Sequence, residues 1–184
     1  GDRFLRAGPA YGGSCFPKDT RALIDIADKY KTDLSIIKSV VKSNNQRKMI
    51  LTKRIDKILN NKLKNKNITF LGVTFKPNTD DMREASSIPM INYLNKKGSK
   101  IRYYDPSGRK KEFDKLKNVK FYSSISSACI KSDLIIIHTE WNAFKLLDFK
   151  RLVKKKNFKV FDMRNIYSQD KMRDLRIDYT SIGR

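Results

Sequence analysis

Short apolar segments alternate with helix-spaced segments throughout residues 62–184, and this alternation restricts the fold more than any other feature. The clearest segment is Leu134-Ile135-Ile136-Ile137-His138, where four consecutive aliphatic residues predict a strand buried on both faces. We expect strands at 68–72, 100–105, 119–122, 134–138 and 159–162, and helices at 86–97 and 124–131. Strands that alternate with helices form a parallel sheet covered by helices, so the sequence predicts an α/β fold.

Two helices are predicted before the first strand. Apolar residues at helical spacing indicate a first helix that ends near Tyr30. Thr32-Asp33 then offers a cap for a long second helix over about 34–60. The apolar stripe of this second helix is interrupted by the polar run 43–47.

A polar and charged stretch at 60–67 separates the two patterns and indicates a domain boundary. We therefore predict two units. Residues 1–61 form a helical segment with a cysteine motif near its start, and residues 62–184 form the sheet domain.

The cysteine motif is Gly12-Gly13-Ser14-Cys15-Phe16-Pro17-Lys18-Asp19, which places a thiol between a glycine turn and the start of a helix. Paired glycines allow a sharp turn and the close approach of a ligand, and Pro17 suits the first position of a helix. Unpaired amides, the helix dipole and the charge of Lys18 favour the thiolate of Cys15. We interpret Cys15 as a nucleophile. The alternative is a small apolar residue of the core.

The chain is strongly basic, with 41 Lys and Arg against 19 Asp and Glu and a formal net charge of +22. Such a surface attracts phosphate-bearing ligands, and nucleic acid is the alternative partner. The basic residues are scattered, however, and aromatic residues are not interleaved with them in an RNA-reading pattern. We interpret the charge first as a biased composition and second as a field that attracts anionic nucleotide sugars, and we do not expect nucleic acid as a partner.

Neither a metal site nor a membrane span is expected. Cys15 and Cys129 are the two cysteines, and with one histidine in the chain they form no recognisable metal-ligand pattern. No run approaches the about 18 apolar residues that a membrane helix needs. A working thiol fits a reducing cytoplasm.

Three blocks of the sequence resemble the UDP-glucose 6-dehydrogenases, which belong to the UDP-glucose/GDP-mannose dehydrogenase family. The first block is Phe4-Leu5-Arg6-Ala7-Gly8-Pro9-Ala10-Tyr11 running into the cysteine motif. The second is Phe70-Leu71-Gly72-Val73-Thr74-Phe75-Lys76-Pro77-Asn78-Thr79-Asp80-Asp81-Met82-Arg83-Glu84. The third comprises Thr139-Glu140-Trp141, Asp162-Met163-Arg164-Asn165-Ile166-Tyr167 and Ser181-Ile182-Gly183-Arg184.

The resemblance implies a helical segment followed by a Rossmann-like parallel-sheet domain that binds a UDP-sugar. It implies oxidation of UDP-glucose to UDP-glucuronate by NAD in two hydride transfers, through a cysteine thiohemiacetal and thioester. It also implies a homodimer formed through the central helix. Members of the family begin with a dinucleotide-binding domain, and no strand followed by Gly-x-Gly-x-x-Gly occurs here. We therefore expect a C-terminal piece that is inactive alone.

The resemblance also assigns roles to residues. Cys15 is the nucleophile, and Asp19 is the acid that orients water or a neighbouring group; the alternative for Asp19 is a partner of the helix dipole. Lys18 and Arg83 contact NAD. The substrate-binding residues are Phe4, Leu5, Arg6, Ala7, Gly8, Tyr11, Gly12, Phe75, Lys76 and Arg164. His138, Trp141 and Cys129 are expected to be structural.

Two alternatives remain open. Enzymes that act on GDP-mannose or UDP-N-acetylmannosamine share the same motifs, and the residues do not identify the base. A basic module that binds nucleic acid or another polyanion belongs to a different class. Its binding would weaken steeply with salt, whereas saturable UDP binding would survive moderate salt.

Overall fold

Six strands form one parallel sheet in the computed structural model, which describes residues 5–183. The strands are β1 (Asn67–Leu71), β2 (Lys100–Tyr104), β3 (Val119–Phe121), β4 (Leu134–Ile137), β5 (Lys159–Asp162) and β6 (Asp178–Ser181). Their order in the sheet is β3-β2-β1-β4-β5-β6, and every neighbouring pair is parallel. This is the Rossmann order, in which the chain reverses direction across the sheet between β1 and β4.

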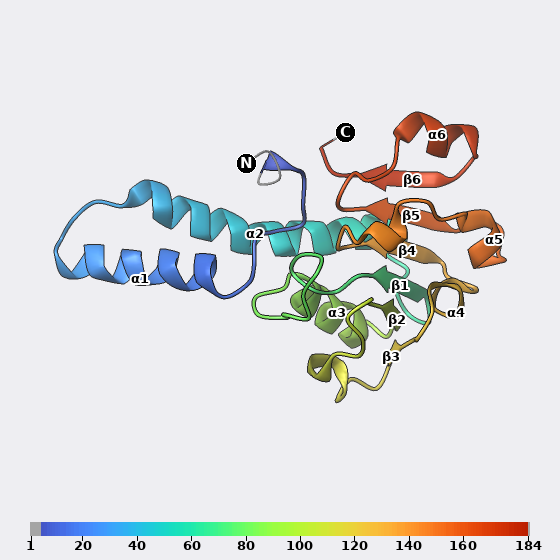
Figure 1. The fold of residues 1–184 in the computed structure, drawn as a ribbon, viewed down its shortest axis with the longest axis horizontal. Coiled ribbons are helices and arrows are strands. Elements are labelled where there is room, and N and C mark those ends of the chain that lie inside the picture. Colours follow the sequence, from blue (N-terminus) through green and yellow to red (C-terminus); the bar gives the residue numbers. More distant parts are fainter. Residues whose placement is uncertain (1–4, 184) are drawn as a thin grey trace.

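The first two helices project from the sheet as an arm (Figure 1). They are α1 (Cys15–Lys29) and α2 (Ser35–Ile58), and they lie side by side. The remaining helices are α3 (Ser87–Lys96), α4 (Ile125–Cys129), α5 (Phe149–Val153) and α6 (Gln169–Asp174), with short 3-10 turns η2 (Lys111–Phe113) and η3 (Asn142–Phe144). Within residues 5–183, no helix combines the length and the apolar character that crossing a membrane requires.

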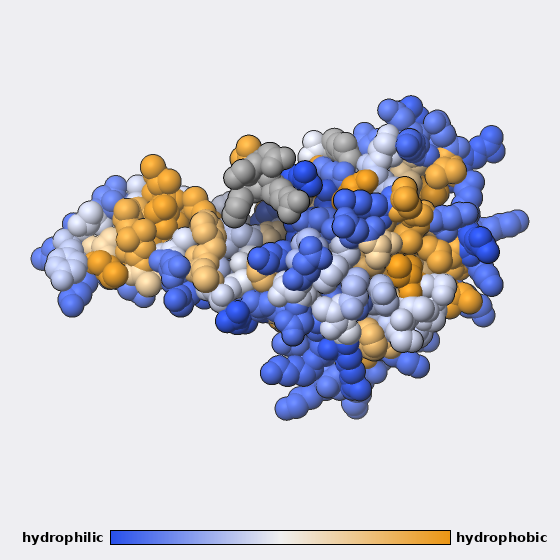
Figure 2. Space-filling model, in the orientation of Figure 1, coloured by the Kyte–Doolittle hydropathy of each residue, from blue (hydrophilic) through white to orange (hydrophobic). Residues whose placement is uncertain are grey.

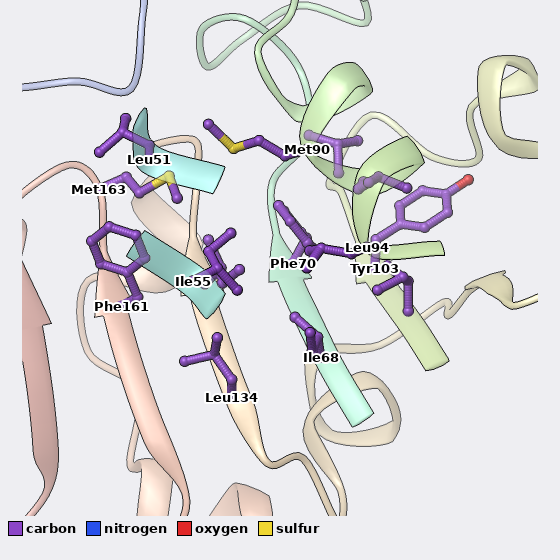
Figure 3. Packing of buried hydrophobic residues seen from close by; sticks show 14 of the residues in the cluster. Leu51, Ile55, Ile68, Phe70, Met90, Leu94, Tyr103, Leu134, Phe161 and Met163 are labelled. Atoms are coloured by element: carbon purple, nitrogen blue, oxygen red, sulfur yellow. The ribbon is translucent and has the colours of Figure 1, made fainter. Parts of the chain in front are cut away.

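Alternate residues of the central strands enter two different cores, because successive side chains of a strand point to opposite faces. Phe70 packs on the face covered by α2 and α3, whereas its neighbour Leu71 packs on the face covered by α4, α5 and α6. Figure 3 shows the first core, where Ile55 of α2 and Leu94 of α3 point toward the strands. This two-sided burial confirms the predicted α/β fold.

Helix α2 belongs both to the arm and to the core. Its last turns bury Leu51 and Ile55, and Leu59 follows directly after the helix in the same core. Its first half leaves Ile36 and Val40 exposed. The predicted division at residues 61 and 62 therefore stays a prediction, since α2 packs on the sheet that follows it.

The five predicted strands are all present, and their ends agree with the prediction to within one residue. The prediction missed β6, a half-exposed edge strand, and the short helices α5 and α6. The helix predicted at 124–131 ends at Cys129, and Lys131 just after it has a positive φ of 59°. Thr32-Asp33 was predicted to cap α2. Leu34 occupies the cap position, but the carboxylate of Asp33 accepts from the amide of Ser35, the first residue of the helix, at 2.9 Å.

Candidate functional site

The carboxyl ends of β1, β4 and β5 meet at the edge of the sheet beside the reversal of strand order. Ligands of open α/β sheets bind at this edge. Three connections leave it, namely 72–86 after β1, 138–141 after β4 and 163–168 after β5. The segment 5–14, which precedes α1, packs against these connections through the contacts described below.

Neighbouring groups of the protein fill the space around the first turn after β1. Gly72 has a φ of +75°, and a Cβ there would lie 2.5 Å from the Cβ of Thr139. The buried carboxylate of Asp105, at the end of β2, accepts hydrogen bonds from the amides of Val73 (2.8 Å) and Thr74 (3.4 Å). These groups hold the loop and leave no room at Gly72 for the close approach of a ligand.

His138 organises the edge from inside the fold. The Oγ1 of Thr139 donates to the carbonyl of Thr74 (2.6 Å), so it can only accept from Nδ1 of His138 (3.1 Å). Nε2 therefore accepts from Oγ of Ser86 at 2.8 Å. Burial, followed by the charge of Arg164, lowers the pKa of His138 to about 3. A neutral, fully buried imidazole agrees with the structural role expected for it.

Cys15 is the first residue of α1 and is exposed, so it is not part of the core. Its Sγ lies 3.6 Å from Oγ of Ser14. Two residues earlier, the amide of Gly13 donates to the carbonyl of Arg83 at 2.8 Å, which docks the cysteine segment on the loop after β1. Cys129 is buried, and burial raises the pKa of its thiol to about 12. Its structural role agrees with the expectation.

The two glycines make a close approach, but to the protein's own loop. A Cβ on Gly12 would lie 2.6 Å from the carbonyl oxygen of Glu84, and one on Gly13 would lie 2.8 Å from the ring of Phe75. Gly13 also has a φ of +86°. Larger residues at either position would push the cysteine segment away from the loop.

Asp19 and Lys18 lie on the exposed surface of α1. The Nζ of Lys18 is 3.4 Å from Oδ1 of Asp19, and both side chains are largely exposed. Asp19 follows Cys15 by four residues and so lies on the same side of the helix.

Helix α2 holds the segment before the cysteine through two residues that sequence analysis missed. Oδ1 of Asn44 accepts from the amide of Tyr11 (2.9 Å), and its Nδ2 donates to the carbonyl of Tyr11 (3.2 Å). Arg47 donates twice to the carbonyl of Gly8, at 3.0 and 3.2 Å. The signal for both was the polar run 43–47 within an amphipathic helix.

Arg164 joins three segments at the edge of the sheet. Its Nε donates to the carbonyl of His138 (2.9 Å) and lies 2.8 Å from Oε2 of Glu140, while Nη2 donates to the carbonyl of Phe75 (3.1 Å). Burial lowers the pKa of Arg164, although Glu140 acts against this. A Cβ on Gly8 would lie 2.8 Å from Nη1. The guanidinium thus binds protein on several sides.

The rest of the loop after β1 reaches the surface. Lys76 is exposed, and its Nζ lies 5.3 Å from the ring centre of the half-buried Phe75. Arg83 is exposed and ion-paired with Asp81 at 2.8 Å. The hydrogen bond from Arg83 to Asp81 raises the pKa of this arginine. The backbone of Arg83 lies beside the cysteine segment, because its carbonyl accepts from the amide of Gly13.

The segment 5–11 contributes its backbone more than its side chains. Leu5 and Arg6 are exposed, and Ala7 packs against the first core. The ring of Tyr11 packs edge-to-face on Phe16 at 4.7 Å. Phe4 lies outside the described residues.

The structure therefore divides most of the predicted site residues into two groups, whereas Ala7 and Tyr11 are half-buried and belong to neither. Those in contact at the edge of the sheet are Gly8, Gly12, Phe75 and Arg164. Those at exposed positions are Leu5, Arg6, Cys15, Lys18, Asp19, Lys76 and Arg83. In the part of the chain that the structure describes, no group of three or more His, Cys, Asp or Glu could hold a metal ion.

Comparisons with known proteins agree with this arrangement. Residues 69–169 match the UDP binding domain of the UDP-glucose/GDP-mannose dehydrogenase family, and residues 1–46 match its central domain. The UDP-glucose 6-dehydrogenase of Rhizobium meliloti (strain 1021) is 37% identical over 187 residues, and UDP-glucose 6-dehydrogenase YwqF of Bacillus subtilis (strain 168) is 40% identical over 190. Each match covers 100% of this chain but only 42% of the relative's length.

Solved structures share the fold. A UDP-glucose dehydrogenase from Pyrobaculum islandicum matches 100% of this chain and 40% of its own, with a TM-score of 0.80 and 27% identity. The NDP-N-acetyl-D-galactosaminuronic acid dehydrogenase of Methanosarcina mazei Go1 matches 96% of this chain and 39% of its own, with a TM-score of 0.83 and 22% identity, which shows the fold alone. Since the UDP-binding match alone spans more than half of the 184 residues, the chain belongs to the UDP-glucose/GDP-mannose dehydrogenase family.

Proposed function

We propose that this chain supplies the nucleophile and the sugar-nucleotide half-site of an NAD-dependent UDP-glucose 6-dehydrogenase, which oxidises UDP-glucose to UDP-glucuronate. The observation that carries the proposal is the exposed Cys15, docked through Gly13 on the loop that leaves β1 at the ligand-binding edge. Relatives with this name support it, although the chain spans only 42% of their length. The reducing cytoplasm suits such a thiol.

In this proposal Cys15 captures an aldehyde. The thiolate sulfur attacks the C6 aldehyde carbon, a C–S bond forms, and the carbonyl oxygen takes up a proton to give a thiohemiacetal. Two-electron oxidation of this adduct gives a thioester. Water then attacks the thioester carbon, the C–S bond breaks, and carboxylate and thiol are released. Asp19, one helical turn from Cys15, would orient that water.

Charge and backbone would hold the nucleotide sugar. Lys76 and Arg164 flank Phe75 and bring positive charge to the edge of the sheet, where phosphate and hydroxyl groups would bind. The backbone of 5–12 would wrap the sugar, with Arg6 nearby. The formal charge of +22 would favour the encounter with a doubly charged pyrophosphate.

Bound NAD would accept the hydride in each of the two oxidation steps. Lys18 lies three residues after Cys15, and the backbone of Arg83 contacts the cysteine segment at Gly13; both side chains are exposed and fit contacts with the phosphates of NAD. The first turn after β1 does not fit a dinucleotide, because Thr139 closes on Gly72 and Asp105 takes the loop amides. We infer that most contacts with NAD come from residues outside this chain. These 184 residues alone would then not catalyse the oxidation of UDP-glucose.

A direct assay tests the proposal. NADH release by the whole protein that contains this chain is measured with each of three substrates, UDP-glucose, GDP-mannose and UDP-N-acetylmannosamine. The Cys15→Ser variant serves as the control. We expect turnover with UDP-glucose and its loss in the control. Turnover with one of the other substrates alone would assign the protein to that branch of the family. UDP binding that vanishes at moderate salt would instead favour a polyanion-binding module.

A further inference from the structure

Glu84 contacts both helices of the arm and lies against the glycine turn that precedes Cys15. It lies near the end of the loop after β1, three residues before α3. Its backbone has a φ of +54°, which residues other than glycine adopt infrequently. Its side chain is about one-third exposed. Such a conformation persists only where surrounding contacts hold it, so the contacts of Glu84 are informative.

The carboxylate of Glu84 bridges both helices of the arm. Oε1 accepts from Nη2 of Arg21 on α1 at 2.8 Å, and Oε2 accepts from Nζ of Lys48 on α2 at 3.2 Å. The Lys48 side chain is only 11% exposed, so this ion pair lies in a partly dry environment, where charges interact more strongly than at the surface. The hydrogen bond from Arg21, together with Lys48, lowers the pKa of Glu84 despite its burial, which keeps the carboxylate charged at neutral pH.

The backbone beside this carboxylate contacts the cysteine segment. The carbonyl of Arg83 accepts from the amide of Gly13, and the carbonyl of Glu84 lies against Gly12. Cys15 follows two residues after Gly13, and Arg21 lies on the helix that Cys15 begins. The cysteine segment is therefore held from two sides, by the backbone of Arg83 and Glu84 at the glycine turn and by the carboxylate of Glu84 on α1.

We propose that Glu84 is a positioning residue: its contacts with Arg21, Lys48 and the glycine turn set the place of Cys15 relative to the loop that carries Phe75 and Lys76. This inference rests on the proposed function for its chemical consequence, since a displaced thiol would capture the aldehyde less efficiently. It names a role for Glu84 that does not involve contact with substrate. The first oxidation, which does not need Cys15, should be affected less than the second.

The test uses Glu84→Gln, which keeps the size of the side chain but places an amide NH₂ against one of the two cations. Asp28→Asn is the matched control, because Asp28 also pairs α1 with α2, through Lys38, but makes no bridge to the loop. Arg21→Gln is a second variant that leaves Glu84 with Lys48. Two quantities are measured: the hydrogen-exchange rate of the Gly13 amide, and the ratio of hydroxylamine-trapped aldehyde to carboxylate formed from UDP-glucose.

For Glu84→Gln we expect about tenfold faster exchange at Gly13, as the loss of a charge-assisted contact predicts, and a rise in trapped aldehyde, with KM for UDP-glucose changed less than about twofold. Arg21→Gln should shift both quantities in the same direction, and Asp28→Asn should match the wild type. Unchanged exchange in Glu84→Gln would overturn the proposal. Faster exchange with an unchanged product ratio would do so too, because Glu84 would then be merely structural. If the wild type does not oxidise UDP-glucose, the proposed function fails, and the exchange rates still decide whether Glu84 holds the cysteine segment.

Discussion

The two cysteines show how strongly position determines the chemistry of one residue type. Cys15 begins a helix at the surface, whereas Cys129 ends one inside the second core. The surroundings of Cys129 keep its thiol protonated, because burial raises its pKa to about 12. Only a thiolate is an effective nucleophile, and so the difference is open to direct measurement.

Limiting iodoacetamide at neutral pH should label Cys15 well before Cys129. The reagent needs access to the sulfur and a thiolate, and Cys129 offers neither. Peptide mass spectrometry gives the two rates, and Cys15→Ser shows the residual labelling of Cys129. Faster labelling of Cys129 would contradict the assignment of Cys15 as the reactive thiol.

Replacement of Lys76 tests the proposed sugar-nucleotide half-site. Lys76→Ala in the whole enzyme should raise KM for UDP-glucose about ten- to a hundredfold, as expected for the loss of a charge-assisted hydrogen bond, with a smaller effect on kcat. The affinity for NAD should stay close to that of the wild type. Steady-state kinetics measure both constants. An unchanged KM would show that Lys76 is an ordinary solvent-exposed residue that does not hold the substrate.

His138 should make the fold sensitive to acid. Its pKa is about 3 in the folded chain against an ordinary 6.5, so the unfolded chain binds the extra proton between these values. Its contribution to stability is therefore complete above about pH 6.5 and is lost as the pH falls toward 3. Between pH 7.5 and 5.0 the wild type should lose about 2 kcal/mol more of its unfolding free energy than His138→Gln. Urea titrations at the two pH values measure this, and equal losses would refute it.

Among the elements, α2 has the most varied role. Its polar middle turns hold the backbone of Gly8 and Tyr11, and its last turns fill the core beneath α3. Its first turns carry Ile36 and Val40 beside a groove of about 590 Å³ that also reaches Tyr11. Figure 2 shows apolar surface on the arm, where Leu23, Ile26, Ile36 and Val40 are exposed. Exposed apolar surface can serve as an interaction surface, and we propose that this face of the arm forms the homodimer that the resemblance to the family implies.

Charge on this face of the arm should prevent the proposed dimer. Ile36→Lys combined with Val40→Lys places like charges opposite each other in any contact between two arms that involves this face of α2. We expect a dimer for the wild type and a monomer for the double variant in sedimentation experiments. Lys42→Ala, on an exposed position of the same helix, is the control for a change of composition alone. A wild type that is monomeric at all concentrations would contradict this arrangement.

The sequence predicts elements better than it predicts contacts between them. Continuous aliphatic runs such as that of β4 identify buried strands, whereas the residues of β6 are polar and half-exposed and gave no such signal. For Asn44 the polar run 43–47 indicated a special position but not a partner, and Glu84 was not singled out by any local pattern. Their partners lie 33 residues away for Asn44, and 36 and 63 residues away for Glu84, so only the folded chain reveals them. The resemblance of the motifs predicted Cys15 and the loop after β1 as parts of the site, but it did not predict the contacts between them.

At the scale of the whole molecule, these long separations have a consequence for the order of folding. The contacts of Glu84 and the hydrogen bond from the Gly13 amide to Arg83 cannot form until β1 and its neighbours have placed the loop at the edge of the sheet. Since these contacts need the loop in its final place, we expect the cysteine segment to dock after the sheet has assembled. In a chain that has not completed its sheet, Cys15 would not be docked at the edge that carries Lys76 and Arg164, whose positive charges we propose to attract the substrate. The chemistry would become available only to chains that have folded correctly.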